Sequence, residues 1–243
     1  MNTDSPIIEI QNLTRRYGKL DAVDGLSLSV RPGKCYGFFG RNGAGKTTTI
    51  KCLLNLLRPD AGTARVFGLD PRKEEVAVKS RLAYVPDQVA FYPWMTVRET
   101  LEYFASFRQH WNRDIENDLL NRFQLDPAKK TTSLSKGQRT QLALISAICP
   151  EPELLVLDEP TSGLDPIGRM KVREIIQRLK SEGKTVFFSS HELGEVETVC
   201  DRVAILNQGE LKAEGRVSDI VKQYQCDLEQ AFLRIIGYQT AKS

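Results

Sequence analysis

The sequence predicts an α/β fold that has a parallel-sheet core, an N-terminal antiparallel β subdomain and an inserted helical subdomain. Three observations predict it. Apolar and polar residues alternate in the first thirty positions, as they do in antiparallel strands. Residues 89–150 have mostly helical patterns. From residue 154 onward, strand patterns alternate with helix patterns, which is the order that builds a parallel sheet with helices packed against it.

The N-terminal strands are expected where apolar residues alternate, in the runs Ile8–Ile10 and Leu26–Val30. We expect turns at Tyr17–Gly18 and Asp24–Gly25, because glycine tolerates the backbone angles of tight turns. A short apolar strand, Lys34–Phe39, comes next and ends in a glycine-rich stretch. This first part of the chain therefore predicts strands that lead directly into a loop of unusual composition.

A helix is expected after the glycine-rich stretch, with apolar residues at spacings of three and four from Ile50 to Leu57 and an end before Pro59. The run Thr96-Val-Arg-Glu99 is a capping-box signal for a further helix. We expect the inserted helical subdomain to span about residues 89–150.

The C-terminal half is expected to contain strand Leu154–Leu157, a helix with the apolar face Val172–Leu179, strand Thr185–Ser189 and another helix. Beyond about residue 217 the pattern is helical again, and this tail is expected to pack on the domain or on a partner. We therefore predict one domain over residues 1–216 and a C-terminal helical tail over residues 217–243.

Composition limits the classes of protein that this chain can belong to. The 243 residues are 27% charged and 41% hydrophobic, which is ordinary for a globular protein. The net charge of +3 is too small to indicate nucleic-acid binding. Five cysteines without a C-x-x-C motif suggest neither a disulfide framework nor a zinc site, and they fit a reducing compartment. We expect no signal peptide, and no apolar run approaches the ~20 residues needed to span a bilayer.

The glycine-rich stretch Gly40-Arg-Asn-Gly-Ala-Gly-Lys-Thr47 fits the motif G-x-x-x-x-G-K-[ST] between an expected strand and an expected helix. Glycines let the backbone approach an anion closely, and the helix N-terminus adds partial positive charge. Lys46 would reach the β- and γ-phosphates of a nucleotide, and the Thr47 hydroxyl would bind Mg²⁺. A simple glycine-rich turn would not require every fixed position of the motif. The expected phosphate-binding residues are Gly40, Arg41, Asn42, Gly43, Ala44, Gly45, Lys46, Thr47 and Thr48.

A second motif, Leu154-Leu-Val-Leu-Asp-Glu159, is a buried strand pattern that ends in two acids. Asp158 would hold Mg²⁺ through water, and Glu159 is placed to polarise the attacking water. A helix N-cap would explain Asp158 alone, but not the acidic pair after a hydrophobic strand in a chain with a phosphate-binding loop. The residues thus indicate a P-loop nucleotide hydrolase.

Two further motifs narrow this class. Leu134-Ser-Lys-Gly-Gln138 precedes Asp158 by about twenty residues, and Ser162-Gly-Leu-Asp165 follows Glu159 closely. In this order and spacing, the motifs resemble those of the nucleotide-binding subunit of an ATP-binding cassette (ABC) transporter, and the resemblance covers nearly the whole chain. It implies an ABC cassette fold, ATP and Mg²⁺ as cofactors, and ATP hydrolysis coupled to transport.

The resemblance also implies roles for residues outside the loop and the acidic pair. Tyr17 would stack on adenine, although a strand-end tyrosine without this role is also compatible. Gln88 would contact Mg²⁺ or the attacking water, and His191 would contact the γ-phosphate. The implied catalytic residues are Lys46, Gln88, Glu159 and His191. Residues implied to contact nucleotide held by a second cassette are Ser135, Gly137, Gln138 and Asp165.

In the ABC family, the signature motif, which is Leu134–Gln138 in this chain, caps the ATP held by another cassette. The resemblance therefore implies a homodimer or heterodimer. Residues 162–169 and 228–234 resemble exporter-type cassettes, whose permease is a separate integral membrane chain. The chain would then lie peripherally on the cytoplasmic face of the membrane. The aromatic run Phe91–Trp94 would receive a permease helix or would form subdomain core. Lys136 replaces a glycine of the usual signature, and it could attract nucleotide or point to solvent.

Two other functions remain to be compared with this one. A soluble ABC ATPase acting on nucleic acid or ribosomes usually has tandem cassettes or a long coiled-coil insertion, and neither pattern is visible in the sequence. A regulatory module that binds ATP without hydrolysing it would not need the retained Glu159 and His191. We therefore expect no nucleic-acid partner and favour the transport ATPase.

Overall fold

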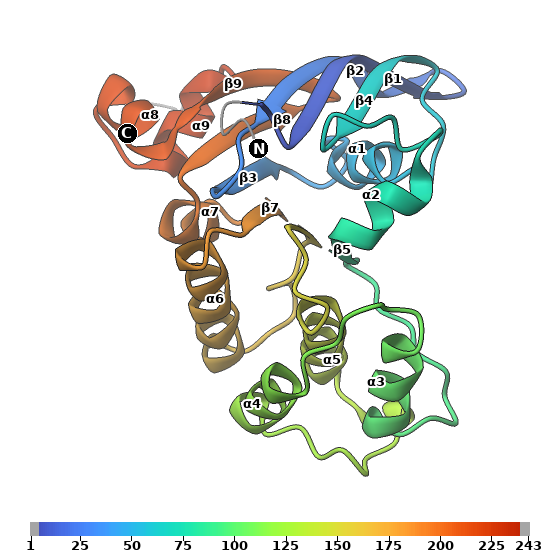
Figure 1. The fold of residues 1–243 in the computed structure, drawn as a ribbon. Helices are drawn as coiled ribbons and strands as arrows, with labels where there is room; N and C mark the ends of the chain where they lie inside the picture. The colour runs from blue at the N-terminus through green and yellow to red at the C-terminus, as the bar shows by residue number, and fades with distance from the viewer. Residues whose placement is uncertain (1–4, 239–243) are drawn as a thin grey trace.

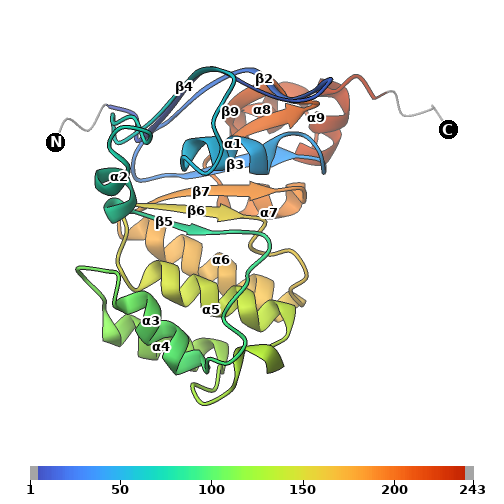
Figure 2. The same cartoon turned by 90° about the vertical axis from the view of Figure 1, so that its right-hand side faces the viewer.

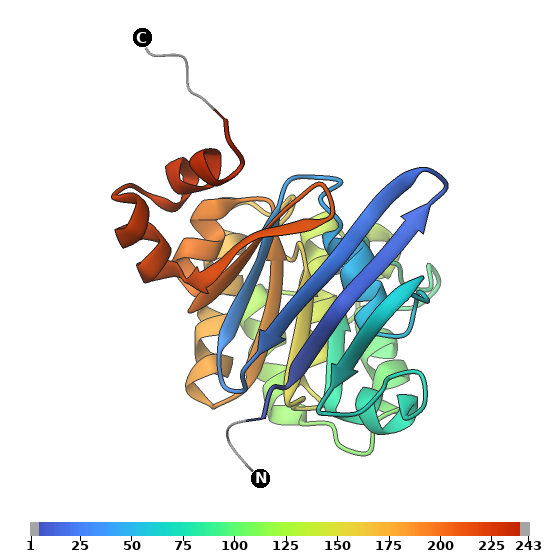
Figure 3. The same ribbon diagram turned by 90° about the horizontal axis from the view of Figure 1, so that it is seen from above.

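Two β-sheets and the helices packed around them make up residues 5–238, which are the residues that the computed structural model describes (Figure 1). The smaller sheet has three strands in the order β2-β1-β4, and the larger has six in the order β5-β6-β7-β3-β8-β9. Seen from above, the smaller sheet lies over the larger one (Figure 3). The strands are β1 (Ile8–Tyr17), β2 (Leu20–Val30), β3 (Cys35–Gly40), β4 (Ala61–Val66), β5 (Leu82–Val85), β6 (Leu154–Asp158), β7 (Thr185–Ser190), β8 (Arg202–Asn207) and β9 (Glu210–Arg216).

The N-terminal strands pair antiparallel, as the alternation of apolar residues predicts. A turn follows Tyr17, because β1 ends there and β2 begins at Leu20. The expected turn at Asp24–Gly25 is wrong, since β2 continues through these residues to Val30. Gly25 has φ 59°, and the pairing register with β1 shifts nearby. A bulge of this kind accommodates a left-handed glycine without reversing the chain.

The larger sheet places the functional motifs at one edge. Its strands are parallel except for β9, which pairs antiparallel with β8. In the register, Phe39 of β3 lies opposite Ser190 of β7, and Asp158 of β6 lies opposite Ser189. The segments that follow β3, β6 and β7 therefore leave the sheet side by side at its carboxyl edge, where ligands bind in open α/β sheets.

The helices lie around this sheet, and Figure 2 shows α3 and α4 on the side away from the three-stranded sheet. Helix α3 begins with the capping box expected at Thr96 and Glu99, in which each side chain accepts the other residue's backbone N–H. The described helices are α1 (Lys46–Leu53), α2 (Glu75–Arg81), α3 (Val97–Ala105), α4 (Arg113–Phe123), the 3₁₀ turn η1 (Thr131–Ser133), α5 (Lys136–Ile148), α6 (Pro166–Ser181), α7 (Leu193–Val199), α8 (Val217–Tyr224) and α9 (Leu228–Ile235).

The boundaries that we expect for the domain, the helical subdomain and the tail stay predictions, and residues 1–4 and 239–243 lie outside the described residues. Within about 89–150 the chain forms α3, α4, η1 and α5, with loops between them. Helix α1 ends at Leu53, earlier than the apolar spacing indicates.

Two apolar clusters fill the space between these layers. One lies between the two sheets and includes the inward side of α1, and the other lies between the larger sheet and the helices on its opposite face. The tail joins the second cluster, because the rings of Phe232 on α9 and Phe39 on β3 meet edge to face at 4.9 Å. Both faces of the central sheet are therefore packed, which holds its carboxyl edge in place. Within residues 5–238, we find no helix with the length and hydrophobicity that crossing a bilayer requires.

Candidate active site

The loop between β3 and α1 turns tightly around the side chain of Lys46. Gly43 has φ 83° and Gly45 has φ 100°, angles that L-residues with side chains rarely adopt. A Cβ atom on Gly45 would lie 2.2 Å from the carbonyl oxygen of Ala22 on β2. Only glycine fits at this close approach, so the motif's second fixed glycine is required by the packing of the loop against β2.

Lys46 is the first residue of α1, and its side chain is buried, with 6% exposed. Its ammonium donates a hydrogen bond to the carbonyl oxygen of Gly40 over 2.6 Å. It also lies 3.0 Å from Oε1 of Glu159, with which it forms an ion pair. A buried ammonium requires such partners.

Asp158 lies at the end of β6 and is fully buried. Ser189 donates a hydrogen bond to its Oδ1 over 2.5 Å, and the Thr47 hydroxyl donates one to its Oδ2 over 2.9 Å. Burial raises the pKa of the Asp158 carboxyl above its ordinary value, and these two hydrogen bonds oppose the rise. The Thr47 and Asp158 oxygens are ligands of the kind that Mg²⁺ prefers.

No group of three or more His, Cys, Asp or Glu side chains in residues 5–238 is arranged to hold a metal ion. Mg²⁺ usually takes one or two protein carboxylates and completes its shell with water and substrate phosphate. The donor set at Thr47 and Asp158 therefore fits a Mg²⁺ ion that arrives with a nucleotide.

Glu159 has φ 53°, which is uncommon for a residue with a side chain and occurs often at functional sites. Its Oε2 accepts hydrogen bonds from the His191 backbone N–H over 3.3 Å and from the imidazole Nδ1, 2.7 Å away. A hydrogen bond from Nδ1 to a carboxylate assigns the proton to that nitrogen. Glu159 thus lies between the Lys46 ammonium and the His191 ring.

A cavity of about 450 Å³ opens beside the loop. The side chains and backbone that line it come from the loop itself, from the segment after β7 and from the turn between β8 and β9. Its lining residues are Arg41, Asn42, Gly43, Ala44, His191, Asn207 and Gln208. The structure therefore brings the phosphate-binding motif and His191, the residue expected to contact the γ-phosphate, to one cavity.

The signature residues line a different cavity, of about 560 Å³. Ser135 caps α5: its hydroxyl accepts the Gln138 backbone N–H over 3.1 Å, and the Gln138 side chain accepts the Ser135 N–H over 3.2 Å. Asp165 caps α6 by accepting the Gly168 N–H over 2.6 Å. No residue lines both this cavity and the one beside the loop. Within one chain, these residues do not reach the phosphate-binding loop.

Within residues 5–238, the side chains of three expected site residues form no hydrogen bond with Lys46, Asp158, Glu159 or His191. Tyr17 ends β1, is 47% exposed and has the Arg15 guanidinium 5.0 Å from its ring centre. Gln88 is exposed in the bend after β5, and it forms no hydrogen bond with any described residue. Thr48 directly follows Thr47 on α1 and is partly buried. The roles that we expect for these side chains stay predictions.

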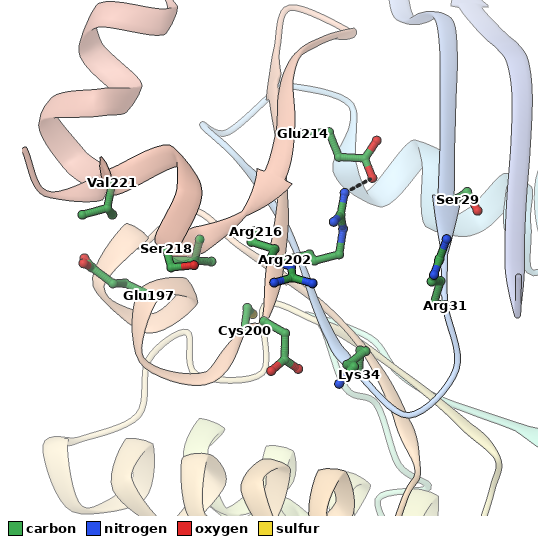
Figure 4. Close-up of a pocket in the computed structure, with 12 residues that line it drawn as sticks. Ser29, Arg31, Lys34, Glu197, Cys200, Arg202, Glu214, Arg216, Ser218 and Val221 are labelled. Carbon is green, nitrogen blue, oxygen red and sulfur yellow. Dashed lines mark ion pairs between the residues drawn. The ribbon is translucent and has the colours of Figure 1, made fainter. Parts of the chain in front are cut away.

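A further cavity, of about 940 Å³, lies elsewhere (Figure 4). It is lined in part by Lys34, which precedes β3, and by Arg202 and Glu214, whose ion pair spans 3.6 Å. The phosphate-binding loop follows the other end of β3. This cavity therefore does not belong to the candidate active site.

A comparison with protein families decides the class. The family model described as ABC transporter matches residues 23–162, more than half of the chain. The chain belongs to the ABC transporter family. The match confirms the predictions of an ABC cassette fold, of an ATP-binding subunit and of an ATPase, and with the structure it confirms the antiparallel β subdomain and the parallel-sheet core.

Known members of the ABC transporter family resemble most of the chain. Bacitracin transport ATP-binding protein BcrA of Enterococcus faecalis is 37% identical over 220 residues, which are 89% of this chain and 71% of that protein. Nod factor export ATP-binding protein I of Paraburkholderia xenovorans is 37% identical over 93% of this chain and 76% of that one. The chain spans from 59% to 76% of the length of the curated relatives that it matches.

A solved structure of the ATP-binding subunit of an ABC transporter has the same fold, with a TM-score of 0.87. The two sequences are 27% identical, and the alignment covers 95% of this chain and 99% of the other. The similarity of fold thus extends beyond the residues matched by the family model.

Sequence reasoning missed several residues of this ABC cassette site. Ser189 donates a hydrogen bond to the Asp158 carboxylate. Its position opposite Asp158, which follows from the parallel pairing of β6 and β7, could have predicted this contact. Asn207 ends β8 and Gln208 follows it, and both line the cavity because β8 pairs with β3. Polar residues at the end of a strand pattern were the available signal, but it could be used only once β8 was known to lie next to β3.

Proposed function

We propose that this ABC cassette binds MgATP in the loop between β3 and α1, hydrolyses it, and so powers an exporter. One observation carries the proposal: the Glu159 carboxylate lies 3.0 Å from the Lys46 ammonium and 2.7 Å from the His191 ring. A carboxylate fixed beside a phosphate-binding lysine is suited to orient water against the terminal phosphate.

The phosphate-binding loop supplies the grip on the nucleotide. Its backbone amides, the N-terminus of α1 and the Lys46 ammonium all offer positive charge to the triphosphate. Thr47 and Asp158 would hold Mg²⁺, which neutralises phosphate charge as hydrolysis proceeds. Gln88 lies in the bend after β5, and we expect it to contact Mg²⁺ or the attacking water when a second cassette closes over the nucleotide.

Glu159 and His191, which follow β6 and β7, would have different roles in hydrolysis. Glu159 would orient the attacking water and accept its proton. Through Nδ1, His191 would fix the Glu159 carboxylate. A contact of Nε2 with the γ-phosphate would need a proton on that nitrogen as well, because phosphate oxygens only accept hydrogen bonds. Both groups are held by backbone at the ends of parallel strands, so little rearrangement is needed before the reaction.

A second cassette would complete the site. Ser135, Gly137, Gln138 and Asp165 line a cavity that is separate from the phosphate-binding loop of their own chain. We therefore infer that they cap the nucleotide held by a partner cassette, as a homodimer or a heterodimer. Two ATP molecules would then join the halves, and hydrolysis would release them.

The membrane partner is proposed to be a permease in a separate chain, which places this subunit peripherally at the cytoplasmic face of the membrane. Support comes from the relatives, whose names state bacitracin transport and Nod factor export. A groove of about 320 Å³ lies beside the exposed Tyr92 and Trp94. Its lining residues include Val89, Phe91 and Pro93, an apolar set that suits a helix from the permease.

The variant Glu159→Gln tests the proposed chemistry. It keeps the shape of the side chain but removes the base, so turnover should fall by about a hundredfold or more, while MgATP still binds. The measurement is phosphate release at saturating MgATP, together with nucleotide affinity. Glu182→Gln, an exposed carboxylate that pairs with Arg178 on α6, is the matched control and should hydrolyse ATP at the native rate. Native turnover by Glu159→Gln would remove Glu159 from this role.

A further inference from the structure

Lys136 is in an unusual place for a lysine. It is the first residue of α5, directly after the N-cap Ser135, and the first turn of the helix contains no acidic residue. A helix N-terminus carries partial positive charge, so a cation there is unfavourable unless acceptors from elsewhere compensate it. The Lys136 side chain is 56% exposed, so burial does not force it into its position.

The Lys136 ammonium finds its partners in two other segments of the chain. It donates a hydrogen bond to the Ser162 hydroxyl over 3.3 Å, and it lies 3.9 Å from Oδ1 of Asp87. Asp87 follows β5 and Ser162 follows β6, and these strands are parallel neighbours in the sheet. One side chain therefore connects the start of α5 with two adjacent points on the carboxyl edge of the sheet.

The alkyl chain of Lys136 fits the backbone at Gly163. Gly163 has φ 75°, and a Cβ atom at this position would lie 3.1 Å from Cδ and 3.5 Å from Cε of Lys136. A Cβ atom at position 163 would press on the lysine side chain and push it by a few tenths of an ångström. The glycine after Ser162 and the lysine after Ser135 thus match each other in shape.

Each of the three connected segments carries a residue of the proposed machinery. Gln88 follows Asp87, Ser135 precedes Lys136, and the Ser162 backbone N–H donates to the Glu159 carbonyl oxygen over 3.0 Å. A shift of any one segment would change the distances between Glu159, the proposed base, Gln88, which would contact Mg²⁺, and Ser135, which would cap the partner's nucleotide. The chain departs from the usual signature sequence at the one residue that makes this connection.

We propose that Lys136 is a positioning residue for hydrolysis. It ties the signature turn to the Asp87–Gln88 bend and the Ser162–Gly163 turn of the same chain, so that these parts meet a second cassette as one unit. The inference rests on the proposed function. In the alternative, Lys136 would reach the triphosphate held by the second cassette, but its ammonium would first have to leave both Ser162 and Asp87.

A double-mutant cycle in ATP hydrolysis tests this role, with the variants Lys136→Met, Asp87→Asn and the double variant. Loss of the exposed ion pair with Asp87 and of the hydrogen bond to Ser162 predicts a three- to fivefold lower kcat for Lys136→Met, about the upper limit for exposed pairs. The KM for MgATP should change by less than about twofold. The double variant should be no slower than Lys136→Met, because the same contact is lost only once. Lys79→Met, which breaks an exposed ion pair with Glu75 on α2, is the matched control.

Two kinetic results would overturn the inference. An unchanged kcat for Lys136→Met would show that the contact positions nothing. A KM raised several-fold, with effects of the two single variants that add, would assign the lysine to the nucleotide of the second cassette.

Urea unfolding of the same four proteins without nucleotide separates this inference from the proposed function. A coupling energy between Lys136→Met and Asp87→Asn supports the contact, and strict additivity overturns it. If the native chain hydrolyses no ATP, the proposed function fails, whereas the unfolding cycle still decides whether the contact exists.

Discussion

Single residues in the site occupy positions that are unfavourable for folding. The Asp158 carboxylate is fully buried with two hydroxyl donors, and Glu159 has a left-handed backbone. The Lys46 ammonium is buried beside them. Functional sites commonly retain such groups at a cost in stability, because the chemistry needs them. Removing the buried Asp158 charge should therefore stabilise the fold and reduce activity at the same time.

Asp158→Asn should raise the free energy of unfolding of the nucleotide-free chain at pH 7 by about 1 kcal/mol and abolish Mg²⁺-dependent hydrolysis. Burial raises the folded-state pKa of this carboxyl above its ordinary 3.8, so the folded state favours the protonated form. The penalty is absent below pH 3.8, where both states are protonated, and it develops as the pH rises through that value. Urea titrations from pH 7 downward should show that the difference in free energy of unfolding between Asp158→Asn and the native chain becomes smaller. A difference that is absent at pH 7, or constant with pH, would contradict this explanation.

The ends of secondary-structure elements place most of the functional side chains. Gly45, Ser135 and Asp165 are the N-caps of α1, α5 and α6, so three helices begin at residues that we propose to contact nucleotide.

The region from 91 to 107 adds an aromatic surface around α3. Trp94 is 63% exposed and Phe107 is 70% exposed, although their rings pack on Tyr92 and Tyr103. Exposed aromatics at this density mark a contact surface.

The double variant Trp94→Ser/Phe107→Ser should lose binding to the permease, because it removes two large exposed aromatic side chains from the surface around α3. The measurement is co-purification of integral membrane proteins with the tagged chain from detergent-solubilised membranes of the source cells. Leu20→Ser, which changes an exposed apolar residue at the start of β2, is the control and should retain the membrane protein. Equal recovery of that protein with the double variant would place the docking surface elsewhere.

For the whole molecule, the strand and motif pattern explains why the site could largely be predicted from the sequence. Lys46, the Asp158–Glu159 pair and His191 are far apart in the chain, but they lie at or after the carboxyl ends of three parallel strands, β3, β6 and β7. Strand patterns and motif order were enough to expect these residues together. The turn at Asp24–Gly25 was wrong because a bulge and a hairpin present the same glycine signal in a sequence.

The contacts that were not predicted depend on distances between segments. The hydrogen bond from Ser189 to Asp158 required the pairing of β6 with β7. The contact of Lys136 with Ser162 joins residues 26 positions apart, and no local pattern indicates it. Tyr17 and Gln88 are exposed in the single chain, and their expected partners are a nucleotide and a second cassette.

The most direct test of the proposed site is calorimetric titration of the purified chain with MgATP, compared with Lys46→Ala. The native chain should bind one MgATP per chain, and the variant should bind at least about tenfold more weakly, since it loses a charge-assisted contact with the phosphates. Lys212→Ala, which changes an exposed lysine on β9 paired with Glu210, should bind like the native chain. A folded native chain that does not bind MgATP, or equal affinity in Lys46→Ala, would contradict the phosphate-binding role of this loop.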